Sequence, residues 1–159
     1  MKPLALELDG VLGDTGPLWR DWLEDAARRF RSIAPLDPGA LPKDRADAAE
    51  ELDRWAEAGV GDWRDSLRRF AEDRAPVYLR PNAEVSAALR ALGASGWRLG
   101  VFTDAPEALA QIALAQLGAD RRIEALETGA GALERLRERL GPETLVIRSA
   151  AELDLQFTR

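Results

Sequence analysis

The stretch that decides the fold is LALELDGVLGDT, residues 4–15. A short apolar run ends here in two carboxylates two positions apart, Glu7 and Asp9, and Gly10 follows at once. An apolar run closed by Asp-Gly predicts a buried β-strand that leads into a turn. Ligands bind at the carboxyl ends of strands in parallel α/β sheets, so the carboxylate pair marks a candidate site.

The composition of the chain limits the classes of protein to which it can belong. With 159 residues, 46% of them apolar, it fits one domain or a core with an inserted lobe. A net charge of -6 argues against a general affinity for nucleic acid or for anionic membrane surfaces. The apolar runs are too short to span a bilayer, and no signal peptide precedes the first strand. We therefore expect a cytoplasmic protein without nucleic-acid or membrane partners.

Two residue types are absent, and their absence restricts the chemistry. The chain has no Cys and no His, which excludes disulfides, thiol nucleophiles, imidazole bases and the usual zinc ligand sets. Lysine occurs only as Lys2 and Lys43. Any catalysis must therefore use carboxylates, hydroxyls, arginine and a hard metal held by oxygen.

The pattern of apolar residues predicts two different regions. Between Gly16 and about Asp73, apolar residues recur at the spacing of amphipathic helices, and a Pro- and Gly-rich segment at 34–44 interrupts the pattern. Later residues alternate between helices and strands, with helices at 83–92, 104–117 and 133–140 and strands at 97–103, 123–126 and 144–147. This alternation predicts an α/β fold with a Rossmann-like, mostly parallel sheet, flanked by helices and carrying an inserted helical lobe.

The ends of the best strands carry the residues that could perform chemistry. The first strand ends in Glu7 and Asp9, the second in Thr103 and Asp104, and the last in Arg148. Carboxylates, a hydroxyl and the N-termini of the following helices suit a phosphate and a divalent cation.

On these residues the chain resembles the haloacid dehalogenase superfamily, and within it the phosphatases with a helical cap after the first strand. The first motif of that family reads D-x-D-G-x-[VL]-x-D-[ST], and residues 7–15 match every fixed position except the first, where Glu7 stands. The second motif, a strand ending in Ser or Thr, is matched by residues 99–103. The resemblance implies a core formed by residues 1–15 and 75–159 and a cap formed by residues 16–74.

The resemblance also implies phosphoryl transfer to water from a small phosphorylated metabolite. The position of Glu7 is that of the nucleophile, Asp9 that of the general acid and base, and Thr103 that of the hydroxyl that binds phosphoryl oxygens. Gly10, Asp104 and Arg148 are further candidates for phosphate binding. If Mg²⁺ is retained, Glu7 and Asp9 are its candidate ligands.

Three of the four family motifs are altered in this chain. Glu7 is one methylene longer than Asp, a shift of roughly an ångström that can reduce a rate about a hundredfold. The lysine of the third motif is missing, and only arginines such as Arg121, Arg122 and Arg135 could supply charge. In the fourth motif Arg148 replaces a metal-binding Asp, where it would repel Mg²⁺ and could pair with Glu7.

Two functions remain open from the sequence. The first is a catalytically inactive member that binds an unidentified protein or a phosphorylated metabolite, which Arg148 could hold without Mg²⁺. The second is a Mg²⁺-dependent phosphatase that uses Glu7 and Asp9. The sequence also leaves open that Glu7 and its neighbours are an engineered or sequencing-level alteration.

Several residues near the site have purely structural alternatives. Asp104 is expected to be the N-cap of the next helix, and the hydroxyl of Thr103 could simply form a hydrogen bond with a backbone group. Asp14 and Thr15 could either cap a helix or shape the site, and Ser149 with Glu152 resembles a capping box. The tryptophans are expected in the core of the cap, or lining an apolar ligand site: Trp19, Trp22, Trp55 and Trp63.

Overall fold

The core is a parallel sheet in which the first strand occupies an interior position. In the computed structural model, which describes residues 2–157, the sheet has four strands in the order β3-β2-β1-β4, and all its pairings are parallel. The strands are β1 (Pro3–Glu7), β2 (Arg98–Thr103), β3 (Ala125–Thr128) and β4 (Leu145–Ile147). This arrangement confirms the α/β fold expected from the sequence.

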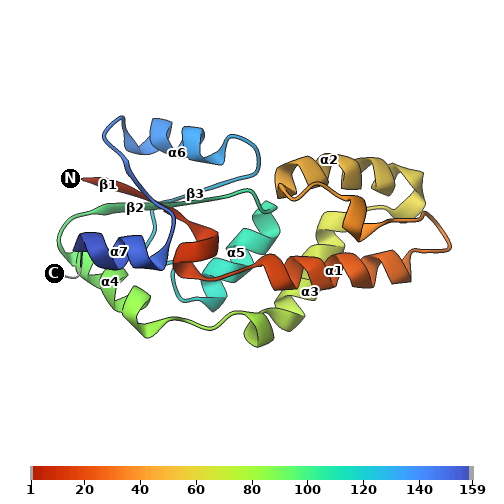
Figure 1. The fold of residues 1–159 in the computed structure, drawn as a ribbon, viewed down its shortest axis with the longest axis horizontal. Helices are drawn as coiled ribbons and strands as arrows, with labels where there is room; N and C mark the ends of the chain where they lie inside the picture. The colour runs from red at the N-terminus through yellow and green to blue at the C-terminus, as the bar shows by residue number, and fades with distance from the viewer. Residues whose placement is uncertain (1, 158–159) are drawn as a thin grey trace.

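Helices cover both faces of the sheet, and three more form a lobe at one end of the molecule (Figure 1). Helix α6 lies on one face, and α4, α5 and α7 lie on the other. The lobe, which we call the cap, contains α1, α2 and α3. The helices are α1 (Gly16–Arg29), α2 (Arg45–Trp55), α3 (Trp63–Tyr78), α4 (Ala83–Ala94), α5 (Glu107–Gln116), α6 (Ala132–Leu140) and α7 (Ala150–Phe157). Within residues 2–157, none of them combines the length and apolarity that crossing a bilayer requires.

Strand β1 is apolar on both faces because both are covered. Leu4, Ala5 and Leu6 are completely buried, which explains why the sequence shows a continuous apolar run instead of alternation. On the neighbouring strand, a Cβ atom at Gly100 would lie 2.7 Å from Cδ1 of Leu136 in α6. Glycine at this position therefore allows α6 to pack closely against the sheet.

The cap has its own aromatic core. The rings of Trp19 and Trp22 in α1 lie 5.5 Å apart, and the ring of Trp63 in α3 lies 5.7 Å from Trp22 and 6.4 Å from Trp19. The cap position expected for these tryptophans is thus observed. The expected end of the cap at residue 74 falls inside α3, because this helix continues through Pro76 to Tyr78.

The structure corrects two local expectations. Asp104 is not the N-cap of α5, since the helix begins at Glu107 with Pro106 at its N-cap position. The third strand spans Ala125–Thr128, two residues later than expected, because its pairing with β2 runs from Gly100 to Thr103. The expected role of Ser149 is confirmed, as its hydroxyl accepts a hydrogen bond from the backbone N–H of Glu152 at 3.1 Å.

Candidate functional site

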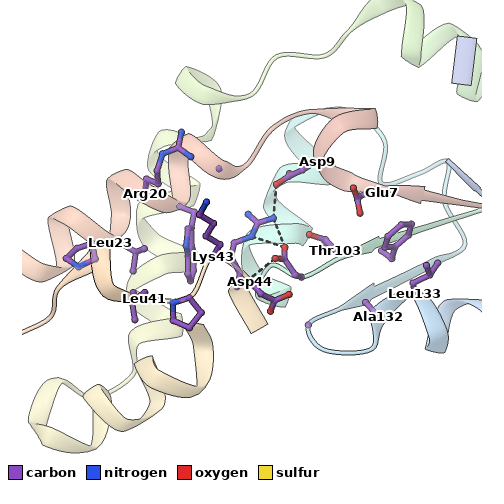
Figure 2. A pocket seen from close by; sticks show the side chains of 18 of the residues that line it. Glu7, Asp9, Arg20, Leu23, Leu41, Lys43, Asp44, Thr103, Ala132 and Leu133 are labelled. Atoms are coloured by element: carbon purple, nitrogen blue, oxygen red, sulfur yellow. Dashed lines mark hydrogen bonds and ion pairs between the residues drawn. The ribbon is translucent and has the colours of Figure 1, made fainter. Parts of the chain in front are cut away.

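The residues at the strand ends meet at the edge of the sheet that faces the cap. Glu7 is the last residue of β1 and Asp9 lies just beyond it, while Thr103 is the last residue of β2 and Asp104 follows it. All four line a cavity of about 760 Å³ between cap and core (Figure 2). Arg148 follows β4 and contacts Glu7 from the side. The sheet topology therefore brings together the side chains that the sequence predicted at the ends of the strands.

The turn after β1 depends on Gly10. Its φ angle is +102°, a backbone conformation that residues other than glycine rarely adopt. In addition, a Cβ atom here would lie 2.6 Å from the carbonyl oxygen of Arg148. Gly10 thus allows the loop that carries Asp9 to approach the backbone that carries Arg148.

The carboxylate of Asp9 is held by Thr15. It accepts hydrogen bonds from the backbone N–H of Thr15 at 2.9 Å and from its hydroxyl at 2.8 Å. Thr15 makes no side-chain cap for α1, whereas Asp14 accepts a hydrogen bond from the backbone N–H of Gly16 at 2.9 Å. Of the two roles considered for this pair, Thr15 shapes the site and Asp14 supports the start of the helix.

A residue of the cap, Arg45, completes the site. Its guanidinium donates to Asp9 at 2.7 Å, to Asp104 at 2.9 Å and to the hydroxyl of Thr15 at 2.5 Å. The backbone N–H of Arg45 also donates to Asp104 at 3.0 Å. Only 8% of the Arg45 side chain is exposed, so a buried arginine joins the cap to two partly exposed acids of the core.

Arg45 was missed by sequence reasoning, although a weak signal exists. It is the first residue of α2, directly after the N-cap Asp44. A cation is unfavourable there, because the N-terminus of a helix carries partial positive charge. Such a placement indicates an acidic partner elsewhere, but not which one. The same contact explains why Asp104 does not cap α5, since its carboxylate binds Arg45 instead.

Glu7 and Arg148 form the pair that the sequence suggested. An Nη atom of Arg148 donates to Oε2 of Glu7 at 2.9 Å, and its guanidinium lies 5.4 Å from the ring centre of Phe102. Burial raises the pKa of Glu7 above its ordinary value, while the charge and the hydrogen bond of Arg148 oppose this rise. Since both side chains remain partly exposed, the pair contributes little to stability, but it places a cation against the carboxylate of Glu7.

The remaining candidates have local partners. The buried hydroxyl of Thr103 accepts a hydrogen bond from the backbone N–H of Ala105 at 3.2 Å. Arg135 pairs with Glu127 at 2.9 Å and also donates to the carbonyl of Thr128. Its guanidinium is therefore bound beside β3. Arg121 and Arg122 precede β3 and therefore belong to the opposite edge of the parallel sheet.

The side chains of this site do not fit a magnesium ion. Mg²⁺ requires oxygen ligands in near-octahedral geometry, usually with carboxylates directed at the ion. Here a guanidinium lies against Asp9 and another lies against Glu7. Across the described positions 2–157, no group of three acidic, His or Cys side chains is placed to hold a metal.

Comparisons with known proteins agree with the fold. The sequence model of a family described as haloacid dehalogenase-like hydrolase matches residues 8–155. No curated protein is significantly similar to the chain in sequence.

Solved structures with the same architecture share few residues with this chain. CbbY from Rhodobacter sphaeroides, in complex with phosphate, has a TM-score of 0.66 at 13% identity, covering 92% of this chain and 76% of CbbY. A hydrolase from Pseudomonas syringae has a TM-score of 0.65 at 17% identity, covering 97% and 78% of the two chains. A HAD phosphatase from Thermococcus onnurineus has a TM-score of 0.56 at 17% identity, covering 93% and 77%. At these identities the likeness shows the fold alone.

Proposed function

The chain belongs to the haloacid dehalogenase-like hydrolase family, and we propose that it is a member that binds a small molecule instead of transferring a phosphoryl group. The observation that supports this proposal is that arginines pair with the acids of the site. Arg45 binds Asp9 and Asp104, and Arg148 binds Glu7. The phosphatases that the chain resembles use Mg²⁺ to balance charge at this place, and here the chain's own cations do so.

The geometry around Glu7 disfavours nucleophilic attack. A carboxylate nucleophile must be ionised and free to approach phosphorus. Oε2 of Glu7 is hydrogen bonded to Arg148 at 2.9 Å, so this oxygen is not free to approach phosphorus while the pair is intact. The additional methylene of Glu also displaces the attacking oxygen relative to Asp.

Asp9 is poorly placed to act as a general acid and base. Both of its oxygens accept hydrogen bonds from Thr15, and Oδ2 also accepts one from Arg45. A catalytic acid or base must be within hydrogen-bond reach of the atom whose proton it moves. Proton transfer would first require Asp9 to release part of this network, which also holds the cap.

The proposal predicts no Mg²⁺-dependent hydrolysis of p-nitrophenyl phosphate by the wild type, Glu7→Asp or Glu7→Ala. Placing Asp at position 7 should not create activity. Arg45 still binds Asp9, and the positive charges of Arg45 and Arg148 still disfavour Mg²⁺ at this site. Steady-state release of p-nitrophenolate checks this result. Wild-type turnover that Glu7→Ala abolishes would overturn the proposal and make Glu7 a nucleophile.

A further inference from the structure

We propose that the cavity between cap and core binds a small organic acid, with its apolar body against the cap and its single negative charge at Lys43 and Arg20. This inference deepens the proposed binding function and rests on it. It places the anion on the cap side of the cavity, away from Glu7 and Asp9.

The size of the cavity suits a small molecule. Its volume of about 760 Å³ lies within the range of about 300–1,000 Å³ that is typical of ligand pockets. Cap and core both contribute to the lining, so a ligand there would be enclosed from two sides. A molecule with one or two aromatic rings fits this space.

Much of the wall is apolar. The cap contributes Trp19, Leu23 and Leu41, and the core contributes Phe102 and Leu133. Trp19 is also part of the aromatic core of the cap, which holds its ring in place. These aromatic and aliphatic side chains favour an apolar body, because burying that body removes it from water. The polar part of the lining includes the acids at the strand ends and the cations of the cap.

Two of the three cap cations that line the cavity are available to a ligand, because the third, Arg45, binds Asp9 and Asp104. Arg20 and Lys43 are exposed and make no salt bridge or side-chain hydrogen bond with any other residue among positions 2–157. Figure 2 shows both side chains on the cap side of the site, and no dashed line joins either of them to another residue drawn. Their partner would therefore be an anion supplied from outside the chain.

The core side of the cavity disfavours a doubly charged phosphate. Glu7, Asp9 and Asp104 carry three negative charges, against two positive charges on Arg45 and Arg148. A phosphate placed against the sheet would meet this excess of negative charge, and the guanidinium of Arg45 is already bound to Asp9 and Asp104. A monoanion held at Lys43 and Arg20 lies away from this excess and from Arg45. The cap contributes one acid to the lining, Asp44, whose Oδ1 accepts a hydrogen bond from the backbone N–H of Asp47 at 3.0 Å.

Two fluorescent probes of similar shape test the inference. The first is 1-anilinonaphthalene-8-sulfonate, an aromatic monoanion, and the second is N-phenyl-1-naphthylamine, the same aromatic body without the charge. We expect Lys43→Gln and Arg20→Gln each to weaken binding of the anion about three- to tenfold, because each removes a partly exposed charge contact. Binding of the neutral probe should change by less than about twofold.

Matched substitutions far from the cavity serve as controls. Lys2→Gln removes the other lysine, which lies over the ring of Trp97, and Arg31→Gln removes an exposed arginine in the turn after the cap helix α1. Both should bind the anionic probe like the wild type. The inference is overturned if these controls lose as much affinity as the cavity variants, or if the two probes respond alike.

Competition distinguishes an organic acid from phosphate. We expect benzoate to displace the anionic probe at lower concentration than inorganic phosphate does, and the reverse order would overturn the inference. Neither result bears on the predicted lack of phosphatase activity, which the p-nitrophenyl phosphate assay tests on its own. Conversely, Glu7-dependent hydrolysis would overturn the proposed function whatever the probes do.

Discussion

Arg45→Met is expected to lower the free energy of unfolding by about 2–4 kcal/mol, because it removes the only arginine that binds Asp9 and Asp104 within residues 2–157. Breaking a buried ion pair leaves a charge without a partner in a poorly solvated place. Asp9 and Asp104 keep 28% and 35% side-chain exposure, so the expected loss is somewhat smaller than for fully buried acids. Urea denaturation monitored by tryptophan fluorescence measures it.

Arg54→Met is the matched control for this prediction. Arg54 lies in the last turn of the same helix and is exposed, so its loss should change stability by less than about 0.5 kcal/mol. In an Asp104→Asn background, Arg45→Met should be less damaging, because one of the two orphaned charges is already gone. Equal effects of the Arg45 and Arg54 substitutions would contradict the structural role given to Arg45.

Gly10→Ala should destabilise the protein by about 2–5 kcal/mol, the sum of a strained backbone angle and a steric clash. The new Cβ atom would lie 2.6 Å from the carbonyl oxygen of Arg148, and a backbone atom cannot easily move away. The segment after β4 would have to shift, and the Glu7–Arg148 hydrogen bond would shift with it. Thermal denaturation measures the loss.

Gly96→Ala separates the two causes. Gly96 also has a positive φ angle, +83°, but a Cβ atom there meets nothing within 4 Å. Its substitution should therefore cost only about 1–2 kcal/mol for the left-handed conformation. If Gly10→Ala costs no more than Gly96→Ala, the close approach between Gly10 and the Arg148 backbone has no energetic importance.

Local patterns were enough to predict most of the fold. Strand β1 follows from its apolar run, and helix α7 follows from Ser149, whose hydroxyl caps it. The contact between Glu7 and Arg148 was also foreseeable, because the motifs place both at strand ends on one edge of the sheet. These features depend on short stretches of sequence or on the general topology of parallel sheets.

The part of the site that joins cap to core could not be predicted in the same way. Arg45 and Asp104 are 59 positions apart, and no periodicity relates them. Their contact depends on how the cap is oriented over the sheet, which follows from packing around side chains such as Trp22 and Leu67. For the same reason, the sequence favoured Asp104 as a helix N-cap, a local role that the distant arginine displaces.

The central claim is that arginines occupy the place of the metal in this site. The most direct test is a titration with Mn²⁺, which prefers oxygen ligands as Mg²⁺ does, followed by the electron paramagnetic resonance signal of the free ion. For the wild type, Asp9→Asn and the exposed-site control Asp14→Asn, we predict that the free signal grows in proportion to added metal. Saturable loss of about one equivalent of Mn²⁺ in the wild type and in Asp14→Asn, but not in Asp9→Asn, would contradict the account, since it would require the metal site that Arg45 and Arg148 are argued to replace.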